Sequence, residues 1–195
     1  IAIAFDGKFM GYITIADNIK PDSAVAIQKL KQMNVDVTML SGDKTTVVDS
    51  VAELTGISHA YGELLPEAKV EKIKTFINKK QTVAFVGDGV NDAPAIAISH
   101  VGIAMGGLGS DAAIEVADVV IQDDNPAKIP LAIKIGKQTK KIVWQNITLA
   151  FAIKAMVLLL GAGGIATMWE AVFADVGVAL LAILNATRLL HFKFK

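Results

Sequence analysis

The sequence predicts an α/β domain, with a parallel sheet and helices on both faces, followed by a transmembrane helical hairpin. Two observations carry this prediction. Through about residue 140, short apolar runs alternate with amphipathic stretches, which is typical of buried parallel strands separated by helices. The last third instead holds two long, nearly uncharged runs. With 195 residues, the chain can bury a core of ordinary size without metal or disulfide links.

The charge and cysteine content argue against several classes of protein. Lys plus Arg and Asp plus Glu each number 19, so the formal net charge is +0 and the basic footprint of a nucleic-acid binder is missing. We therefore expect no nucleic-acid partner. The sequence has no cysteine, which excludes disulfides, thiolate metal ligands and a cysteine nucleophile from these residues.

The N-terminal elements are expected to be a short hairpin and a helix. Strand-like runs at residues 1–5 and 12–15 flank Asp6 and Gly7, a pair that favours a tight turn. A helix is then expected to follow Pro21.

Strands and helices alternate beyond this helix. We expect strands at 35–40, 82–86, 101–105 and 119–121, and helices at 45–54, ended by Gly56, and at 68–77. Asn125 and Pro126 mark the joint at which the sheet domain passes to a long Lys-rich helix.

The two apolar runs predict membrane helices at about 145–164 and 169–190. Lys154 is the only charged residue from Ile147 to Trp169, and Asp175 is the only one from Ala171 to Thr187. Each predicted helix is long enough to cross a hydrocarbon core of ~30 Å. Lysines before the first run and Arg188 after the second place both outer ends of the hairpin in the cytoplasm. The alternative is a pair of buried helices in a soluble core.

The loop after the strand at 35–40 suits phosphate binding. It reads Ser41, Gly42 and Asp43, a hydroxyl and a permissive backbone just before a helix start. A hydroxyl and backbone N–H groups at the positive end of a helix bind phosphate. The alternative, an ordinary helix N-cap, uses the same residue types.

The loop after the strand at 82–86 suits a hard cation. Asp88, Asn91 and Asp92 lie within one short Gly-rich turn, and carboxylate and amide oxygens are ligands that Mg²⁺ accepts. A turn with Asx caps would explain one or two of these residues. Lys69, near the start of the helix at 68–77, could reach across to a phosphoryl group or could be a solvated helix lysine.

These loops resemble those of the P-type ATPases, whose phosphorylation domain has the haloacid dehalogenase-like fold. The resemblance rests on four motifs in the family's order: S-G-D at 41–43, P-x-x-K ending at Lys69, G-D-G-V-N-D-A-P at 87–94 and G-I-A-M-G at 102–106. It implies a Mg²⁺-dependent aspartyl-phosphate chemistry with ATP as substrate. The implied roles are Mg²⁺ ligation by Asp88, phosphoryl contacts from Asn91 and the loop of Ser41, Gly42 and Asp43, charge neutralisation by Lys69, and positioning of Lys69 by Asp92.

The charges within the membrane runs form the second candidate site. At ~1.5 Å per residue, Lys154 and Asp175 lie at matching depth in the hairpin and can pair. Charged groups in a span are costly and mark function. The functional interpretation makes Asp175 a ligand for a transported cation and Lys154 its counter-ion. The alternative is an ion pair that only links the two helices.

The membrane motifs resemble the zinc, cadmium and lead exporting branch of the heavy-metal P-type ATPases. They are I-K-A-M at 153–156, A-D-V-G at 174–177 and L-N-A-T-R-L-L at 184–190. The chain lacks the D-K-T-G-T motif with the phosphorylated aspartate and the Cys-Pro-Cys metal motif. We therefore interpret it as the C-terminal portion of a pump that cannot run the cycle alone.

The resemblance also implies an organisation into domains. Residues 1–20 would end a nucleotide-binding domain and its hinge, 21–127 would be the phosphorylation domain, and 128–195 would hold the last two membrane helices. The implied partners are the lipid bilayer and the remainder of the pump, in a cell membrane with the phosphorylation domain in the cytoplasm.

Two other hypotheses stay open at this point. A membrane-tethered phosphatase of the haloacid dehalogenase-like type would use the same Lys69, Asp88 and S-G-D loop. A binding or scaffold protein on a decayed fold would need none of them, which disfavours it because Lys69 and its acidic neighbours are all present.

Overall fold

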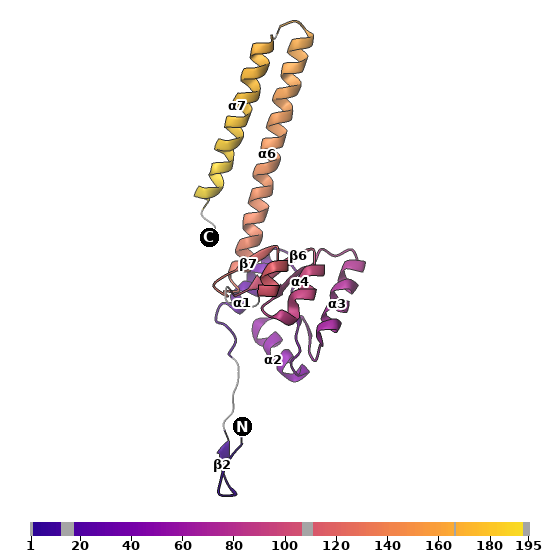
Figure 1. The fold of residues 1–195 in the computed structure, drawn as a ribbon, viewed down its shortest axis with the longest axis vertical. Coiled ribbons are helices and arrows are strands. Elements are labelled where there is room, and N and C mark those ends of the chain that lie inside the picture. The colour runs from indigo at the N-terminus through magenta and orange to yellow at the C-terminus, as the bar shows by residue number, and fades with distance from the viewer. Residues whose placement is uncertain (1, 13–17, 107–110, 166, 193–195) are drawn as a thin grey trace. The chain divides into compact units, whose positions relative to one another are not determined.

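The computed structural model describes residues 2–12, 18–106, 111–165 and 167–192. The chain divides into two compact units, Ile1–Lys128 and Ile129–Lys195. Figure 1 shows the alternating helices and strands of the first unit and the two long helices of the second.

The first unit begins with an antiparallel hairpin. Strands β1 (Ala2–Phe5) and β2 (Lys8–Tyr12) are joined by Asp6 and Gly7, whose φ angles of 48° and 73° are those that a two-residue hairpin turn requires. The predicted turn is confirmed, but the expected start of the second strand at Tyr12 is wrong. The tight turn already pairs Phe5 with Lys8, and residues 13–15 of the expected strand lie outside the described residues.

Helices and strands then alternate as the sequence predicts. The elements are α1 (Ser23–Gln32), β3 (Thr38–Leu40), α2 (Thr45–Thr55), β4 (His59–Tyr61), α3 (Pro66–Asn78), β5 (Ala84–Gly87), the 3₁₀ helix η1 (Val90–Asp92), α4 (Ala93–Ile98), β6 (Val101–Met105), α5 (Asp111–Val116) and β7 (Val119–Ile121). Gly56 ends α2 in the left-handed conformation, at φ 78°.

The described parallel strands form two sheets rather than one. β3 pairs with β4, and β5, β6 and β7 pair in that order. The predicted parallel α/β fold is confirmed, while β4 was missed because a strand of three residues carries no apolar run. β3 is shorter than expected because the N–H of Val35 donates to the carbonyl of Leu30 and closes α1 instead of joining a ladder.

A small core fixes α4 against β6. Ile96, Ala104 and Ala113 are almost fully buried, with Phe85 and Ile114 packed around them. At Gly102, an added Cβ would lie 2.5 Å from Cγ2 of Ile96, so the missing side chain allows the helix to approach the strand. This contact holds the segment between β5 and α4, which carries the second candidate loop, in a fixed place.

The second unit is a helical hairpin of α6 (Lys128–Ala162) and α7 (Met168–Thr187), followed by the 3₁₀ helix η2 (Arg188–His191). The helical segments Lys128–Ala162 and Met168–His191 are long and apolar enough to cross a membrane, and only 6% of the most apolar window of each is buried. The length and composition of both helices are those that the sequence predicts for membrane helices. Thr167 and Glu170 form a capping box that starts α7.

Candidate functional site

The S-G-D loop is held by its own side chains and by the loop after β4. The Ser41 hydroxyl donates to Oδ2 of Asp43 over 2.8 Å, and the N–H of Asp43 donates back to it over 3.2 Å. The N–H groups of Glu63 and Leu64 donate to the carbonyls of Asp43 and Ser41, respectively. The N-cap of α2 is Lys44, and no side chain caps it. The helix-cap alternative for Ser41 is therefore wrong.

Gly62 makes this arrangement possible and was not singled out from the sequence. A Cβ there would lie 2.8 Å from Cα of Thr45 and 2.9 Å from the carbonyl oxygen of Asp43. The loop after β4 therefore packs directly on the start of α2. Glu63 adds a side-chain bond, accepting from the Thr45 hydroxyl over 3.0 Å. No local sequence signal marks Gly62, because its close neighbours lie more than a dozen residues earlier in the chain.

The second loop brings Lys69 and Asp92 together. Nζ of Lys69 on α3 lies 2.8 Å from Oδ1 of Asp92 at the end of η1, and their side chains are only 16% and 12% exposed. Gly87 permits this position, because its Cβ would lie 2.6 Å from Cβ of Asp92. The ion pair connects α3, which follows β4, to the turn after β5. It therefore links the sheet of β3 and β4 to the sheet of β5, β6 and β7.

Asp88 and Asn91 lie on the same turn but are exposed to solvent. Because Asp92 is engaged by Lys69, Asp88 is the carboxylate of this turn that remains open to a ligand. Among the described residues, no group of three or more His, Cys, Asp or Glu side chains could hold a metal ion. The donor set fits Mg²⁺ bound through one carboxylate together with water and phosphate oxygens, which is how Mg²⁺ is commonly held.

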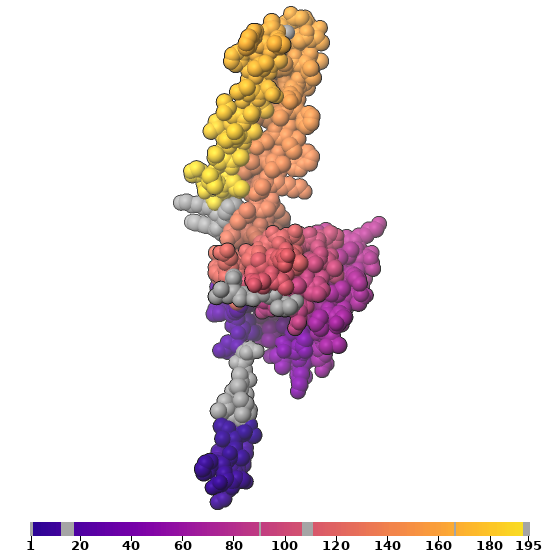
Figure 2. Space-filling model, in the orientation of Figure 1, coloured from indigo at the N-terminus to yellow at the C-terminus, as the bar shows by residue number. Residues whose placement is uncertain are grey.

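The two membrane charges are paired across the hairpin. Nζ of Lys154 on α6 lies 3.3 Å from Oδ1 of Asp175 on α7, and each side chain is 66% exposed. A groove of about 450 Å³ runs beside them between the helices, lined by apolar side chains that include Ile153, Val157 and Val172. Figure 2 shows the side chains of α6 and α7 in contact along the hairpin. The pair therefore borders an open, apolar groove.

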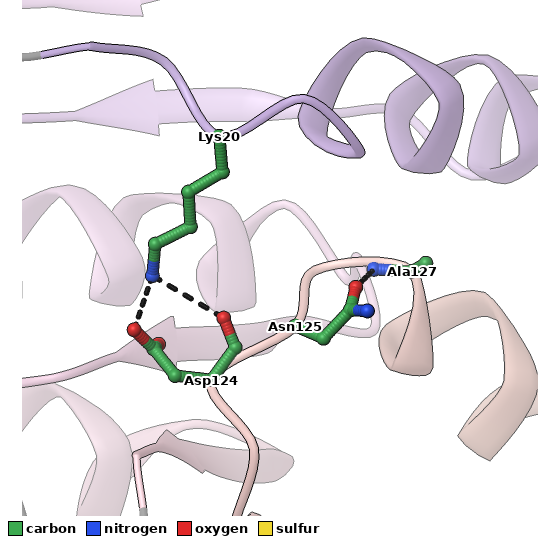
Figure 3. Close-up of polar contacts among 4 residues, drawn as sticks. All are labelled: Lys20, Asp124, Asn125 and Ala127. Atoms are coloured by element: carbon green, nitrogen blue, oxygen red, sulfur yellow. Dashed lines mark hydrogen bonds and ion pairs between the residues drawn. The ribbon is translucent and has the colours of Figure 1, made fainter.

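The segment interpreted as a hinge is tied to the end of the first unit. Lys20 donates to both the carboxylate and the main-chain carbonyl of Asp124 (Figure 3). Asp124 has a φ of 51°, and the side chain of Asn125 accepts from the N–H of Ala127 over 2.8 Å, so the turn before α6 is ordered. The sequence did not predict this contact, and residues 13–17 of the segment 1–20 lie outside the described residues.

Comparison with known proteins shows which proteins this chain resembles. A family model described as haloacid dehalogenase-like hydrolase matches residues 1–100. A zinc-transporting ATPase of Synechocystis sp. is 57% identical over 192 residues, which cover 97% of this chain and 27% of that protein. A cadmium, zinc and cobalt-transporting ATPase of Bacillus subtilis is 49% identical over 199 residues, covering 100% of this chain and 28% of that protein.

Solved structures show the same relationship. The crystal structure of a zinc-transporting PIB-type ATPase in the E2.Pi state has a TM-score of 0.87 at 34% identity, covering 97% of this chain and 31% of that one. The chain thus spans less than a third of the length of each of these three proteins. The predicted resemblance is confirmed: the chain belongs to the haloacid dehalogenase-like hydrolase family, and within it matches the heavy-metal P-type ATPases along nearly its whole length.

Proposed function

We propose that this chain works as part of an ATP-driven pump that exports zinc, cadmium or lead ions and couples aspartyl-phosphate formation and hydrolysis to transport. One observation carries the proposal: the chain joins an enclosed Lys–Asp pair beside candidate phosphate loops to a second Lys–Asp pair between two apolar helices. The name of the Bacillus subtilis relative adds cobalt to the candidate ions.

The phosphoryl site is assembled from both sheets. Ser41, Gly42 and Asp43 bind the phosphoryl oxygens at the end of β3, and Lys69, positioned by Asp92, neutralises their charge. Phosphoryl transfer depends mainly on such positioning and charge stabilisation. The acceptor aspartate comes from the remainder of the pump. Among the described residues, β3 and β5 lie in separate sheets, and each strand is followed by one of the two candidate loops. A strand added between β3 and β5 would therefore place its aspartate carboxylate beside the side chains of both loops.

Asp88 holds the Mg²⁺ ion of this reaction. The exposed carboxylate of Asp88 supports this role, and Asn91 on the same turn contacts the phosphoryl group. When bound, Mg²⁺ supplies positive charge that stabilises the transferring phosphoryl group.

In the membrane, Asp175 is a ligand for the transported cation and Lys154 is a counter-ion that helps to release it. An ion pair that is 66% exposed on an apolar hairpin is costly in a bilayer. We therefore expect other helices of the pump to cover this face and to complete the cation site. We also propose that the pump lies in a cell membrane, with the phosphorylation domain on the cytoplasmic side, because lysines precede the first apolar run and Arg188 follows the second.

The domain assignment follows from the same proposal. Residues 1–20 end the nucleotide-binding domain and its hinge, 21–127 belong to the phosphorylation domain, and 128–195 provide the last two membrane helices. The observed division after Lys128 supports the second of these boundaries.

The test is ATP hydrolysis by the full-length pump in lipid vesicles, titrated with Zn²⁺, Cd²⁺, Co²⁺, Pb²⁺ and Cu⁺. We expect stimulation by the divalent ions and its loss in the Asp175→Ala variant. Hydrolysis of small phosphate esters without any stimulation by these ions would instead favour the membrane-tethered phosphatase. Full metal stimulation in the Asp175→Ala variant would remove Asp175 from the site.

A further inference from the structure

A second set of polar side chains connects the two apolar helices. Asn146 lies on α6 about two turns before Lys154, and Asn185 lies on α7 about three turns after Asp175. Both asparagines are half-buried on the faces that the helices turn toward each other. Neither residue has a part in the proposed chemistry.

The two amides form one connected hydrogen-bond network. Nδ2 of Asn185 donates to Oδ1 of Asn146 over 2.8 Å and to Oε1 of Gln145 over 3.3 Å. Nδ2 of Asn146 donates to the carbonyl of Ala182 over 3.1 Å, and Arg188 donates to Oδ1 of Asn185 over 2.9 Å. Both N–H groups and the carbonyl of the Asn185 amide are thus engaged, so its orientation is determined by its neighbours.

The rest of the helix contact specifies the register only weakly. Three of the half-buried positions of α7 are alanines, Ala171, Ala174 and Ala182, and Val178 is the buried side chain of this helix. Small residues allow close approach but offer few shapes that interlock. A shift by one residue moves a helix by ~1.5 Å along its axis. Such a shift would leave the asparagine amides without partners in an apolar medium, which is costly.

The geometry points to a register clamp. We propose that the Asn146–Asn185 hydrogen bond fixes α6 against α7 and thereby keeps Asp175 opposite Lys154, at the depth where the cation binds. Asn146 and Asn185 are positioning residues, and they touch neither the cation nor the phosphoryl group. This inference rests on the proposed function, because the clamp acts on the membrane site of the pump.

The test uses the full-length pump in vesicles and compares two readouts. The first is the Zn²⁺ concentration that half-saturates ATP hydrolysis, and the second is phosphorylation of the pump by inorganic phosphate, which reports on the phosphorylation domain. In Asn185→Leu we expect the half-saturating Zn²⁺ concentration to rise about 10-fold, the lower end of the effect of lost supporting contacts around metal ligands. Phosphorylation by inorganic phosphate and the maximal rate at saturating Zn²⁺ should stay within about twofold.

Three further variants separate positioning from general damage. Asn185→Gln keeps the donor group and should recover most of the Zn²⁺ affinity. Asn146→Leu should match Asn185→Leu, and the double variant should be no worse than either, because all three remove the same Asn146–Asn185 hydrogen bond. Thr148→Leu, an exposed polar-to-apolar change on α6, is the matched control and should leave the affinity unchanged.

An unchanged half-saturating Zn²⁺ concentration in Asn185→Leu would overturn the clamp, as would additive losses in the double variant. Loss of phosphorylation by inorganic phosphate in Asn185→Leu would show that this variant does not fold. The clamp is then tested by the half-saturating Zn²⁺ concentrations of Asn146→Leu and Asn185→Gln. Failure of the proposed function looks different, because the unmodified pump would then show no Zn²⁺ stimulation at all.

Discussion

Two Lys–Asp pairs of similar length occupy very different surroundings in this chain. Lys69 and Asp92 lie 2.8 Å apart with side chains that are 16% and 12% exposed, whereas Lys154 and Asp175 lie 3.3 Å apart and are each 66% exposed. The first pair is enclosed by elements of its own unit. The second pair is open on the surface of an apolar hairpin, so its surroundings must come from outside this chain.

The difference determines how each pair responds to mutation. Removing one member of a buried pair leaves an uncompensated charge and costs about 3–5 kcal/mol, while exposed pairs in water contribute about 0–1 kcal/mol. The value for pairs exposed to water does not apply to Lys154 and Asp175, because lipid or other helices would surround this pair instead of water. The enclosed pair can therefore be tested by its effect on folding and chemistry, and the open pair by its effect on cation binding.

The largest effect is expected from breaking the enclosed pair. In Lys69→Ala, phosphorylation of the full pump by ATP should slow about 100-fold, since one preorganised charge of the phosphoryl site is lost. Rapid-quench measurement of phosphoenzyme formation checks this. Lys74→Ala is the matched control, because Lys74 lies on the same helix with a side chain that is 52% exposed. Equal rates for Lys69→Ala and Lys74→Ala would contradict the assignment.

A smaller effect is expected from displacing Asp92 without removing a charge. Gly87→Ala would place a methyl group 2.6 Å from Cβ of Asp92. Forcing this group into the site should destabilise the phosphorylation domain by about 1–3 kcal/mol. Thermal inactivation of phosphorylation by inorganic phosphate measures the loss. Gly136→Ala provides the control, because no atom beyond its chain neighbours and its own helix backbone lies within 4 Å of the Cβ added there. Similar inactivation of both variants would exclude a specific role for Gly87.

The smallest effect is expected at an exposed pair in the first unit. Lys20 and Asp124 are paired, but their side chains are 50% and 45% exposed. Asp124→Asn removes the charge but keeps a residue type that tolerates the positive φ, so it should cost less than about 1 kcal/mol of stability and leave thermal inactivation nearly unchanged. A loss as large as that of Gly87→Ala would show that exposure is a poor guide to the strength of these pairs.

The same contrast explains what the sequence could predict. The predicted bounds of β6 and β7 are confirmed, because a short apolar run marks the position of each strand in the sequence. The pairing of Lys154 with Asp175 followed from helix rise alone, and the same arithmetic would have found Asn146 opposite Asn185. In contrast, β4 carries no apolar run, and Gly62 and Asp124 gain their importance only from segments that are distant in the chain.

The central claim is that the turn after β5, with Asp88 and the Lys69–Asp92 pair, serves phosphoryl transfer, and that the Lys154–Asp175 pair serves the cation. Phosphoenzyme formation in the full pump, measured both from ATP with Zn²⁺ and from inorganic phosphate with Mg²⁺, tests it most directly in Asp88→Asn and Asp175→Asn. We predict that Asp88→Asn fails in both reactions, whereas Asp175→Asn keeps phosphorylation by inorganic phosphate and loses the Zn²⁺-dependent reaction with ATP. Zn²⁺-dependent phosphorylation at the normal level in Asp175→Asn, or intact phosphorylation in Asp88→Asn, would contradict the account.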